Sequence, residues 1–511
     1  MFYFIMFKIK KIEVETKHSL IAFLLEDDAK ELSLYPEDRI KIISNITKKS
    51  IICELQIIDF KKKRGVYKDI CLKRGEIGIF ENGFYKLETP ENKLVEITPA
   101  PKPKSLEFVK KKFNGQKLNQ EEFNLITRDI VENKYSEIET TYFVISCSAH
   151  KLSDKEVEYL TNSMVNVGQT LKFAKNKKDI VVDKHCIGGI PNNRTTMLIV
   201  PIVAAAGLKI PKTSSRSITS PAGTADTMEV LANVNLTLTK MHDIVDQLNG
   251  CIAWGGSLDL SPTDDIIINV EHTLEIDSEG QMIASILSKK KSAGSTHVLL
   301  DIPVGKTAKV KNLKEGIRLK KRFEKIGKAV GLHIIAIITD GSGPIGNGIG
   351  PQYEANDVLA ILNLDSNHSK PLKEKALNMA GLIFEMSKFT KKGNGYNLAK
   401  YLLESKIAKA KFDEIVNFQG KKKPLQKAKY SFEFSAIKNG KVFSIHNKLI
   451  SKLAFILGAP EDKVAGIVLN KKIGDRVLLG ENIFTLYSNS ELKLKFAKTF
   501  IKEHQNIYIL K

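Results

Sequence analysis

Short apolar strands alternate with helical stretches through the middle of the chain, from about residue 175 to about residue 400. The pattern predicts strands over 179–182, 296–304 and 333–340, and helices over 197–207 and 354–364. Such an alternation is typical of an α/β layer with a largely parallel sheet. The first strand runs through a glycine turn into a helix, an arrangement that places backbone amides where anions are held.

The chain has 511 residues, too many for one ordinary core, so several folding units are expected. Prolines at 99, 101 and 103 favour an extended linker. We predict an α/β multidomain protein, with β-rich domains at both ends. The predicted domains are β-rich over 1–98, helical over 105–173 with part of 210–260, α/β over 174–427, and β-rich over 428–511.

Local patterns refine this outline. The runs 11–16, 51–59 and 77–87 read as β-structure, and so does the stretch 429–445, which turns at Asn439 and Gly440. The later stretch 465–488 reads as hairpin-like. Ser153 and Glu156 have the spacing of a helix capping box.

Composition narrows the functional classes. The net charge is +21, but the basic runs are scattered and lack interleaved aromatics, so we interpret them as a solvated surface and expect no nucleic-acid partner. No run reaches 18 apolar residues without charge, which predicts a soluble, cytoplasmic protein with no membrane partner. Five dispersed cysteines fit a reducing compartment, and the isolated histidines predict no metal site.

The strongest chemical signal is the segment DKHCIGG at 183–189, followed by NRTT at 193–196. Glycines allow the backbone to approach an oxyanion, Lys184 supplies a positive charge, and the threonines supply hydroxyl donors where a helix begins. These groups suit one phosphate. By composition alone, an ordinary turn between a strand and a helix stays an equal alternative.

Two further clusters carry polar chemistry. The segment KTSSRSITSPAGTAD at 212–226 gathers hydroxyls around one arginine before a helix, which favours a second contact to an oxyanion or a sugar. In the segment 277–291, Ser285 and Lys289 lie four residues apart and would share one face of a helix. An ordinary amphipathic helix with a basic end is the alternative for this segment.

Together, KHCIGG, SSRSITSPAGTAD and ASILSKK resemble the motifs of the thymidine/pyrimidine-nucleoside phosphorylase family, from about Ser105 to the end of the chain. The additional β-domain at the front and the segment TDGSGPIGNGIGP look most like the long-form branch, which includes AMP phosphorylases and bacterial proteins classed as thymidine phosphorylases. The resemblance implies a pentosyltransferase that cleaves an N-glycosidic bond with inorganic phosphate as co-substrate and without a cofactor. It implies that the α/β domain binds phosphate and base, and that the enzyme is a homo-oligomer, a dimer or larger.

The resemblance also implies residue roles. Phosphate would be bound by Lys184, Cys186, Gly188, Gly189, Thr196, Ser214 and Thr224. The base, sugar or nucleotide would be bound by Ser215, Arg216, Ser217, Ile218, Thr219, Ser220, Ser285, Lys289 and Lys309. The catalytic candidates are Asp277, as proton donor to the leaving base, and His185, beside the sugar or base. Because the clusters lie far apart in sequence, we expect a cleft that closes between the helical and α/β layers.

Two positions depart from the family pattern. Cys186 stands where the family has serine, and a thiol is a poorer hydrogen-bond donor. Val270 stands where pyrimidine enzymes carry the arginine that reads the ring. Thymidine (giving thymine and 2-deoxyribose 1-phosphate) and AMP (giving adenine and ribose 1,5-bisphosphate) both stay open as substrates. A phosphoribosyltransferase and a nucleic-acid-binding protein are remoter alternatives.

Overall fold

The computed structural model describes residues 5–14, 20–59, 72–174, 176, 179–217, 220–276 and 278–511. The chain divides into two compact units. The first comprises Met1–Val167 and Pro262–Met282, and the second comprises Gly168–Ser261 and Ile283–Lys511. The later segment that groups with the N-terminal helices is therefore 262–282. From the sequence, part of 210–260 was expected in this place.

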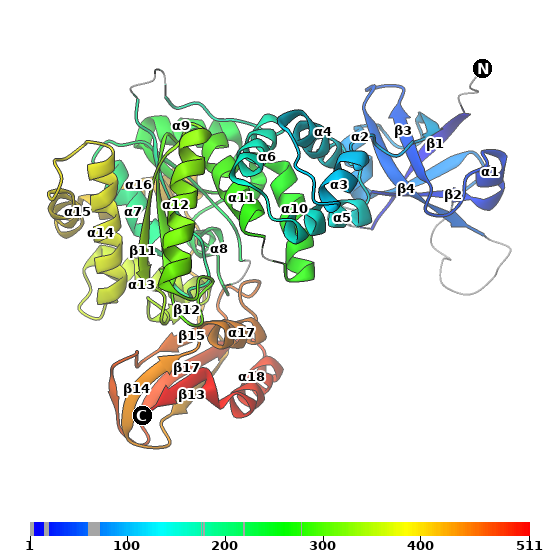
Figure 1. The fold of residues 1–511 in the computed structure, drawn as a ribbon. Helices are drawn as coiled ribbons and strands as arrows, with labels where there is room; N and C mark the ends of the chain where they lie inside the picture. Colours follow the sequence, from blue (N-terminus) through cyan, green and yellow to red (C-terminus); the bar gives the residue numbers. More distant parts are fainter. Residues whose placement is uncertain are drawn as a thin grey trace. The chain divides into compact units, whose positions relative to one another are not determined.

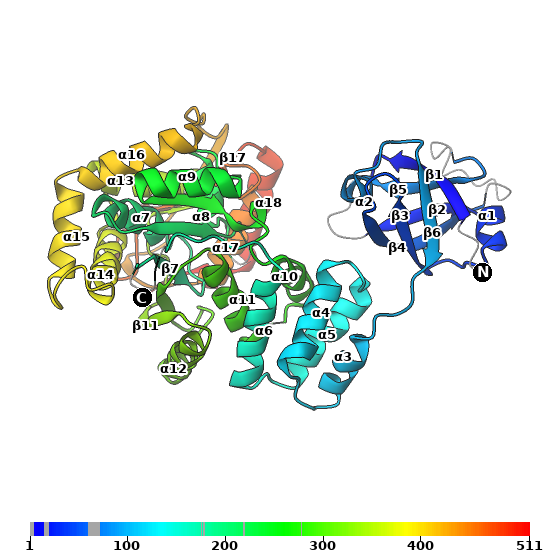
Figure 2. The same cartoon turned by 90° about the horizontal axis from the view of Figure 1, so that it is seen from above.

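The first unit begins with a closed six-stranded barrel, in the order β1-β5-β2-β4-β3-β6 (Figure 2). Alternate side chains of its strands are buried, as in Arg39–Ser44, because successive side chains point to opposite faces of a strand. The expected β-run 77–87 is only half correct, since the strand ends at Phe80 and the rest is helical. The barrel consists of β1 (Ile5–Ile12), β2 (Ile21–Leu25), α1 (Glu26–Glu31), β3 (Arg39–Ser44), β4 (Ser50–Ile58), β5 (Glu76–Phe80), α2 (Glu81–Leu87) and β6 (Leu94–Pro99).

A helical layer follows, and capping residues define where its helices begin. Ser153 and Glu156 form the expected capping box, in which each side chain bonds the other residue's backbone amide. Glu156 also accepts a 2.8 Å hydrogen bond from the buried ammonium of Lys112. The helices are α3 (Leu106–Phe113), α4 (Gln120–Val131), α5 (Glu137–Ala149), α6 (Asp154–Asn166) and α10 (Pro262–Leu274).

The second unit contains the parallel sheet, in the order β11-β10-β7, and a parallel pair β8-β9 (Figure 1). Helix α12 packs against β10 and β11, and α14 packs against β10 and α7. The strand expected over 179–182 begins only at Val182 and extends to Cys186, so Lys184 lies within the strand. The strands are β7 (Val182–Cys186), β8 (Ile210–Ser214), β9 (Gly250–Trp254), β10 (His297–Val304), β11 (His333–Asp340) and β12 (Gly348–Ile349).

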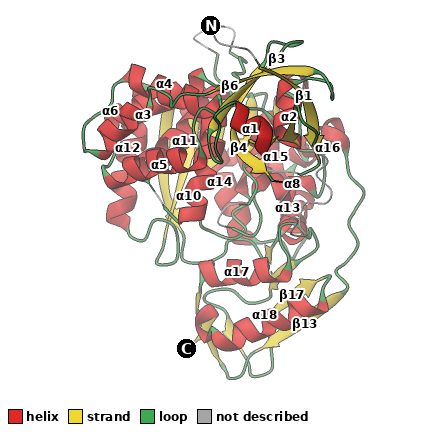
Figure 3. Ribbon diagram, turned by 90° about the vertical axis from the view of Figure 1, so that its right-hand side faces the viewer, coloured by secondary structure: helices red, strands yellow, loops and turns green. Residues whose placement is uncertain are grey.

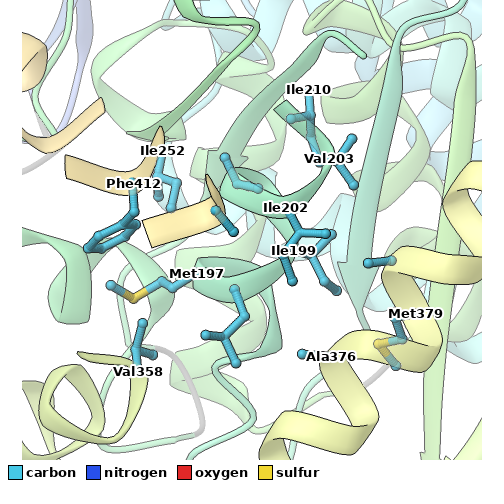
Figure 4. Close-up of a cluster of buried hydrophobic side chains, with 14 of the residues drawn as sticks. Met197, Ile199, Ile202, Val203, Ile210, Ile252, Val358, Ala376, Met379 and Phe412 are labelled. Carbon is cyan, nitrogen blue, oxygen red and sulfur yellow. The ribbon is translucent and has the colours of Figure 1, made fainter. Parts of the chain in front are cut away.

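The helices of this layer bury one large apolar core. Helix α7 is apolar on every side, and Ile199, Ile202 and Val203 lie in the core with Phe412 and Met379 from distant helices (Figure 4). A helix that is apolar all round has to be buried. The helices are α7 (Thr195–Ala205), α8 (Thr224–Glu229), α9 (Leu238–Leu248), η1 (Gly255–Ser257), α11 (Glu279–Ser292), α12 (Leu313–Ala329), α13 (Pro351–Asn363), α14 (Lys370–Met386), α15 (Gly395–Glu404) and α16 (Ile407–Gly420).

The C-terminal part contains two small sheets with α17 and α18 packed beside β17 (Figure 3). Within the hairpin-like stretch 465–488, β15 and β17 pair antiparallel. The β-stretch expected over 429–445 also contains two strands. Its two strands belong to different sheets, since β13 pairs with β17 and β14 pairs with β16 and β18. The elements are β13 (Tyr430–Ser435), β14 (Gly440–Ile445), α17 (Asn447–Leu457), β15 (Gly466–Leu469), β16 (Arg476–Val477), β17 (Asn482–Ser488), α18 (Glu491–Glu503), η2 (Gln505–Ile507) and β18 (Tyr508–Leu510).

The predicted fold class is confirmed: a β-barrel, a helical layer, an α/β layer with a parallel sheet, and a C-terminal β-rich part. Strands 297–304 and 333–340 fall where the sequence predicts them. In the part of the chain that the structure describes, no helix has the length and apolar character needed to cross a bilayer.

The buried Lys112–Glu156 pair generates a stability prediction. Replacing Lys112 by methionine leaves the Glu156 carboxylate buried without its cation, which should cost about 3–5 kcal/mol. Urea unfolding followed by circular dichroism measures the change. The exposed pair between Lys155 and Glu158 is the control, since K155M should cost less than about 1 kcal/mol. Equal effects of K112M and K155M would contradict the prediction.

Candidate active site

Lys184 is the middle residue of β7, where its backbone is in register with Leu299 of β10. Its side chain is only 1% exposed. The ammonium donates a 2.8 Å hydrogen bond to Thr195 Oγ1 and lies 4.0 Å from Asp301 Oδ2. Burial lowers the pKa of Lys184, because removal from water disfavours the charged form.

Asp301 of β10 organises the surroundings of Lys184. Its carboxylate accepts hydrogen bonds from Thr339 Oγ1 at 2.6 Å and from Asn193 Nδ2 at 3.0 Å, and it pairs with Lys375 Nζ at 3.0 Å. Burial opposes its charge, but the ammonium groups of Lys375 and Lys184 hold the pKa of Asp301 below its ordinary value. Asp301 is therefore an ionised carboxylate shared by two ammonium groups.

The glycine turn after β7 needs its glycines. Gly188 and Gly189 have φ of +93° and +86°, which side chains rarely tolerate. A Cβ on Gly189 would lie 3.0 Å from the backbone nitrogen of Lys309. The turn therefore packs closely against the backbone of Lys309, a residue that the family resemblance assigned to nucleotide binding.

Cys186 accepts hydrogen bonds rather than acting as a free thiolate. Its Sγ accepts from Asn193 Nδ2 at 3.1 Å and from the Gly188 amide at 3.4 Å. Burial raises the pKa of the Cys186 thiol to about 11. The thiol stays protonated near neutral pH, and its S–H is its remaining donor.

A second buried carboxylate, Asp183, lies one residue before Lys184. It pairs with Lys290 Nζ at 2.7 Å and with Lys212 Nζ at 3.5 Å. Burial lowers the pKa of Lys212 to about 7, and the neighbouring Lys290 acts in the same direction. Asp183 is thus paired with two lysines of its own, as Asp301 is with Lys184 and Lys375.

His185 follows Lys184 in β7. Burial, together with the positive charges of Lys290 and Lys212, lowers its pKa well below the ordinary value. The imidazole is therefore neutral near pH 7, so one ring nitrogen carries a proton and the other accepts.

In the second loop, Arg216 is engaged by the protein. Its guanidinium pairs with Glu229 at 2.8 Å and with Asp226 at 3.2 Å, and it stacks over the ring of Trp254. Asp226 also accepts from the backbone amides of Ser217 and Gly223. Arg216 therefore stabilises the loop through these ion pairs. Its position among hydroxyl residues in the sequence did not indicate this role.

The same loop presents the other predicted hydroxyls. Ser214 ends β8, and Thr224 begins α8, where its Oγ1 accepts from Arg194 Nη1 at 2.8 Å. Ser217 and Ser220 donate to backbone carbonyls of the loop itself. A Cβ at position 223 would lie 2.4 Å from the carbonyl oxygen of Ser215, so only glycine fits there.

Some predicted residues are brought together and others lie outside the described residues. Seven predicted residues are brought together by β7, by the turn after it, and by the contacts of Arg194 and Gly189. They are Lys184, His185, Cys186, Gly188, Gly189, Thr224 and Lys309. Ser285 and Lys289 lie on α11, as expected, and Lys290 of the same helix pairs with Asp183. Asp277, Ile218 and Thr219 fall outside the described residues.

Sequence reasoning missed several members of the cluster. Asp301 carried a usable signal, since a charged residue within the apolar run LLDIPV has to be paired when buried. Thr195, next to the predicted Thr196, accepts a hydrogen bond from Lys184. Lys375 and Thr339 lie in a helix and a strand without any motif.

Three family models match the chain. The helical bundle domain of the glycosyl transferase family matches residues 106–168, its a/b domain matches 178–316, and the C-terminal domain of pyrimidine nucleoside phosphorylases matches 441–508. Among solved structures, an anthranilate phosphoribosyltransferase from Thermus thermophilus aligns with a TM-score of 0.50 at 17% identity, covering 61% of this chain and 98% of that chain. That likeness concerns the fold alone.

Curated relatives match over nearly the whole length. A protein of Legionella pneumophila strain Paris named "Putative thymidine phosphorylase" is 41% identical over 98% of this chain and 95% of its own length. Proteins of the same name from Methylococcus capsulatus (40% identity, 97% and 94% covered) and Bradyrhizobium diazoefficiens (47%, 82% and 81%) also match. The chain belongs to the thymidine/pyrimidine-nucleoside phosphorylase family and is a glycosyltransferase of the nucleoside phosphorylase type.

Proposed function

We propose that this protein cleaves thymidine with inorganic phosphate, forming thymine and 2-deoxyribose 1-phosphate. The observation that carries the proposal is the charge balance around Lys184. Lys184 and Lys375 both face the Asp301 carboxylate, which leaves a formal excess of one positive charge in a buried place. A phosphate dianion would offset that excess.

In this mechanism Lys184 and the hydroxyls of Thr196, Ser214 and Thr224 hold the phosphate, with the thiol of Cys186 as a further donor. A phosphate oxygen forms the new bond to C1′ while the C1′–N bond breaks, and the electron pair leaves with the base. Holding the two reactants in line contributes about 7–11 kcal/mol in favourable cases. The protein therefore has little covalent chemistry to perform at this step.

The leaving base has to gain a proton or a hydrogen bond. His185 supports that role, since its depressed pKa keeps the imidazole neutral with one N–H to donate. Asp277 is the other proposed donor, by family resemblance. A general acid typically contributes about 10²–10⁴ in rate.

AMP is a second candidate substrate because of position 270. The side chain there is a valine, 8% exposed, within α10, in place of the arginine that reads a pyrimidine ring in the family pattern. An apolar residue cannot form that contact, which favours a purine substrate. By the family resemblance, the loop from Ser215 to Ser220 would then contact the nucleotide and could hold its 5′-phosphate.

The substrate prediction is tested with purified protein, phosphate and a panel of thymidine, uridine and AMP. We expect release of free thymine, with phosphate consumed in equal amount. Adenine from AMP in place of thymine would select the second candidate. No free base from any of the three would reject phosphorolysis as the function.

The role of Lys184 generates a second prediction. Lys184→Ala should lower kcat/KM for phosphate by about 10²–10³-fold, the loss typical when one charge-stabilising donor is removed. Initial rates at varied phosphate measure it, with the thermal midpoint as a folding check. The exposed Lys328 of α12 supplies the control, since K328A should leave the rate unchanged. Full activity of K184A would contradict the proposal.

The thiol at position 186 generates a third prediction. Because its acceptor positions are filled by Asn193 and Gly188, the group that remains for phosphate is a weak S–H donor. Cys186→Ser should lower KM for phosphate about 2- to 10-fold, the range that one neutral hydrogen bond supplies. Steady-state kinetics at fixed nucleoside check it. A higher phosphate KM in C186S would show that sulfur is required there.

A further inference from the structure

Arg194 joins three segments of the second unit through one buried side chain. It immediately precedes α7, and it is 6% exposed. Its Nη1 donates to Thr224 Oγ1 at 2.8 Å, and its Nη2 donates to the carbonyl oxygen of Ala222 at 2.9 Å. Its Nε lies 2.5 Å from Glu354 Oε2. The side chain thus links the loop after β7 to the start of α8 and to α13.

The direction of the bond to Thr224 has a chemical consequence. A guanidinium has only N–H donors and no acceptor, so the Thr224 oxygen has to accept. The hydroxyl has one hydrogen, and that hydrogen is then directed away from Arg194. Thr224 is 8% exposed, so few other orientations are open to it. Arg194 therefore converts a rotating hydroxyl into an oriented donor.

Glu354 holds Arg194 in this orientation. Its carboxylate is fully buried, and its other oxygen accepts from the backbone amide of Gly350 at 3.2 Å. Gly350 has φ of +112° and ends the glycine-rich loop that follows β11. The ion pair thus links that loop to the loop between β7 and α7.

We infer that Arg194, anchored by Glu354, is a positioning residue that orients the Thr224 hydroxyl as a donor to phosphate. This inference rests on the proposed function. In this inference Arg194 acts through Thr224: Nη1 and Nη2 each donate one N–H to a protein partner, and Nε faces the Glu354 carboxylate. Arginine suits this place better than lysine, since its planar fork reaches Thr224 and Ala222 together.

A double-mutant cycle tests the inference. Arg194→Met and Thr224→Val should each raise KM for phosphate about tenfold or more, while KM for the nucleoside or nucleotide changes less than about threefold. The double variant should be no worse than the more affected single variant, because both changes remove the same donor. Arg194→Lys, which retains the charge and loses the fork, should recover only part of the phosphate affinity.

Controls separate this inference from the proposed function. If the wild-type protein cleaves no nucleoside or nucleotide with phosphate, the proposed function itself is wrong. With an active wild type, an unchanged phosphate KM in R194M, or losses that multiply in the double variant, would overturn the inference. Arg476 is exposed on β16, so R476M should match wild type. If R194M does not fold, E354Q replaces it, and an unchanged phosphate KM in E354Q would overturn the inference equally.

Discussion

The proposed phosphate site depends on burying ammonium groups beside carboxylates. A lysine that is 1% exposed loses most of its hydration, and the loss has to be offset by a nearby anion or hydrogen-bond acceptor. Lys184 obtains both from Asp301 on the neighbouring parallel strand and from Thr195 at the start of α7. The pairing of β7 with β10 is what brings these groups within reach. Without that sheet, Lys184 would return to solvent and the charge excess would vanish.

Close backbone packing keeps the loops around this cluster in place. Gly189 lies against the backbone of Lys309, and Gly223 lies against that of Ser215, so neither position accepts a Cβ without movement. Arg194 with Glu354, and Arg216 with Glu229, add ion pairs across the same loops. Donors held in advance require no reorganisation when charge develops during a reaction, which is the usual source of electrostatic catalysis. The need to hold these loops in place explains why the charged side chains of Arg194 and Arg216 pair with protein carboxylates.

The architecture could be predicted from sequence where local pattern and environment agree. Strands 297–304 and 333–340 are mostly apolar, and the central strand of the sheet, 297–304, is buried along most of its length, as its composition suggests. Local pattern is insufficient where the deciding contact is distant. Residues 81–87 form a helix after a strand despite a β-like composition, and β13 and β14 pair with β17 and β18 rather than with each other. A turn signal such as Asn439-Gly440 reports local geometry and says nothing about which strands share a sheet.

The sequence by itself determined the family, the order of the layers and the segment around Lys184, because these are encoded in contiguous motifs and in periodic apolar residues. Only the tertiary structure decided that Asp301 and Lys375 complete the Lys184 cluster, that Lys290 pairs with Asp183, and that Arg194 reaches Thr224. These partners lie 30 to 191 residues apart in the chain. Their proximity follows from strand register and helix packing, which no local pattern specifies.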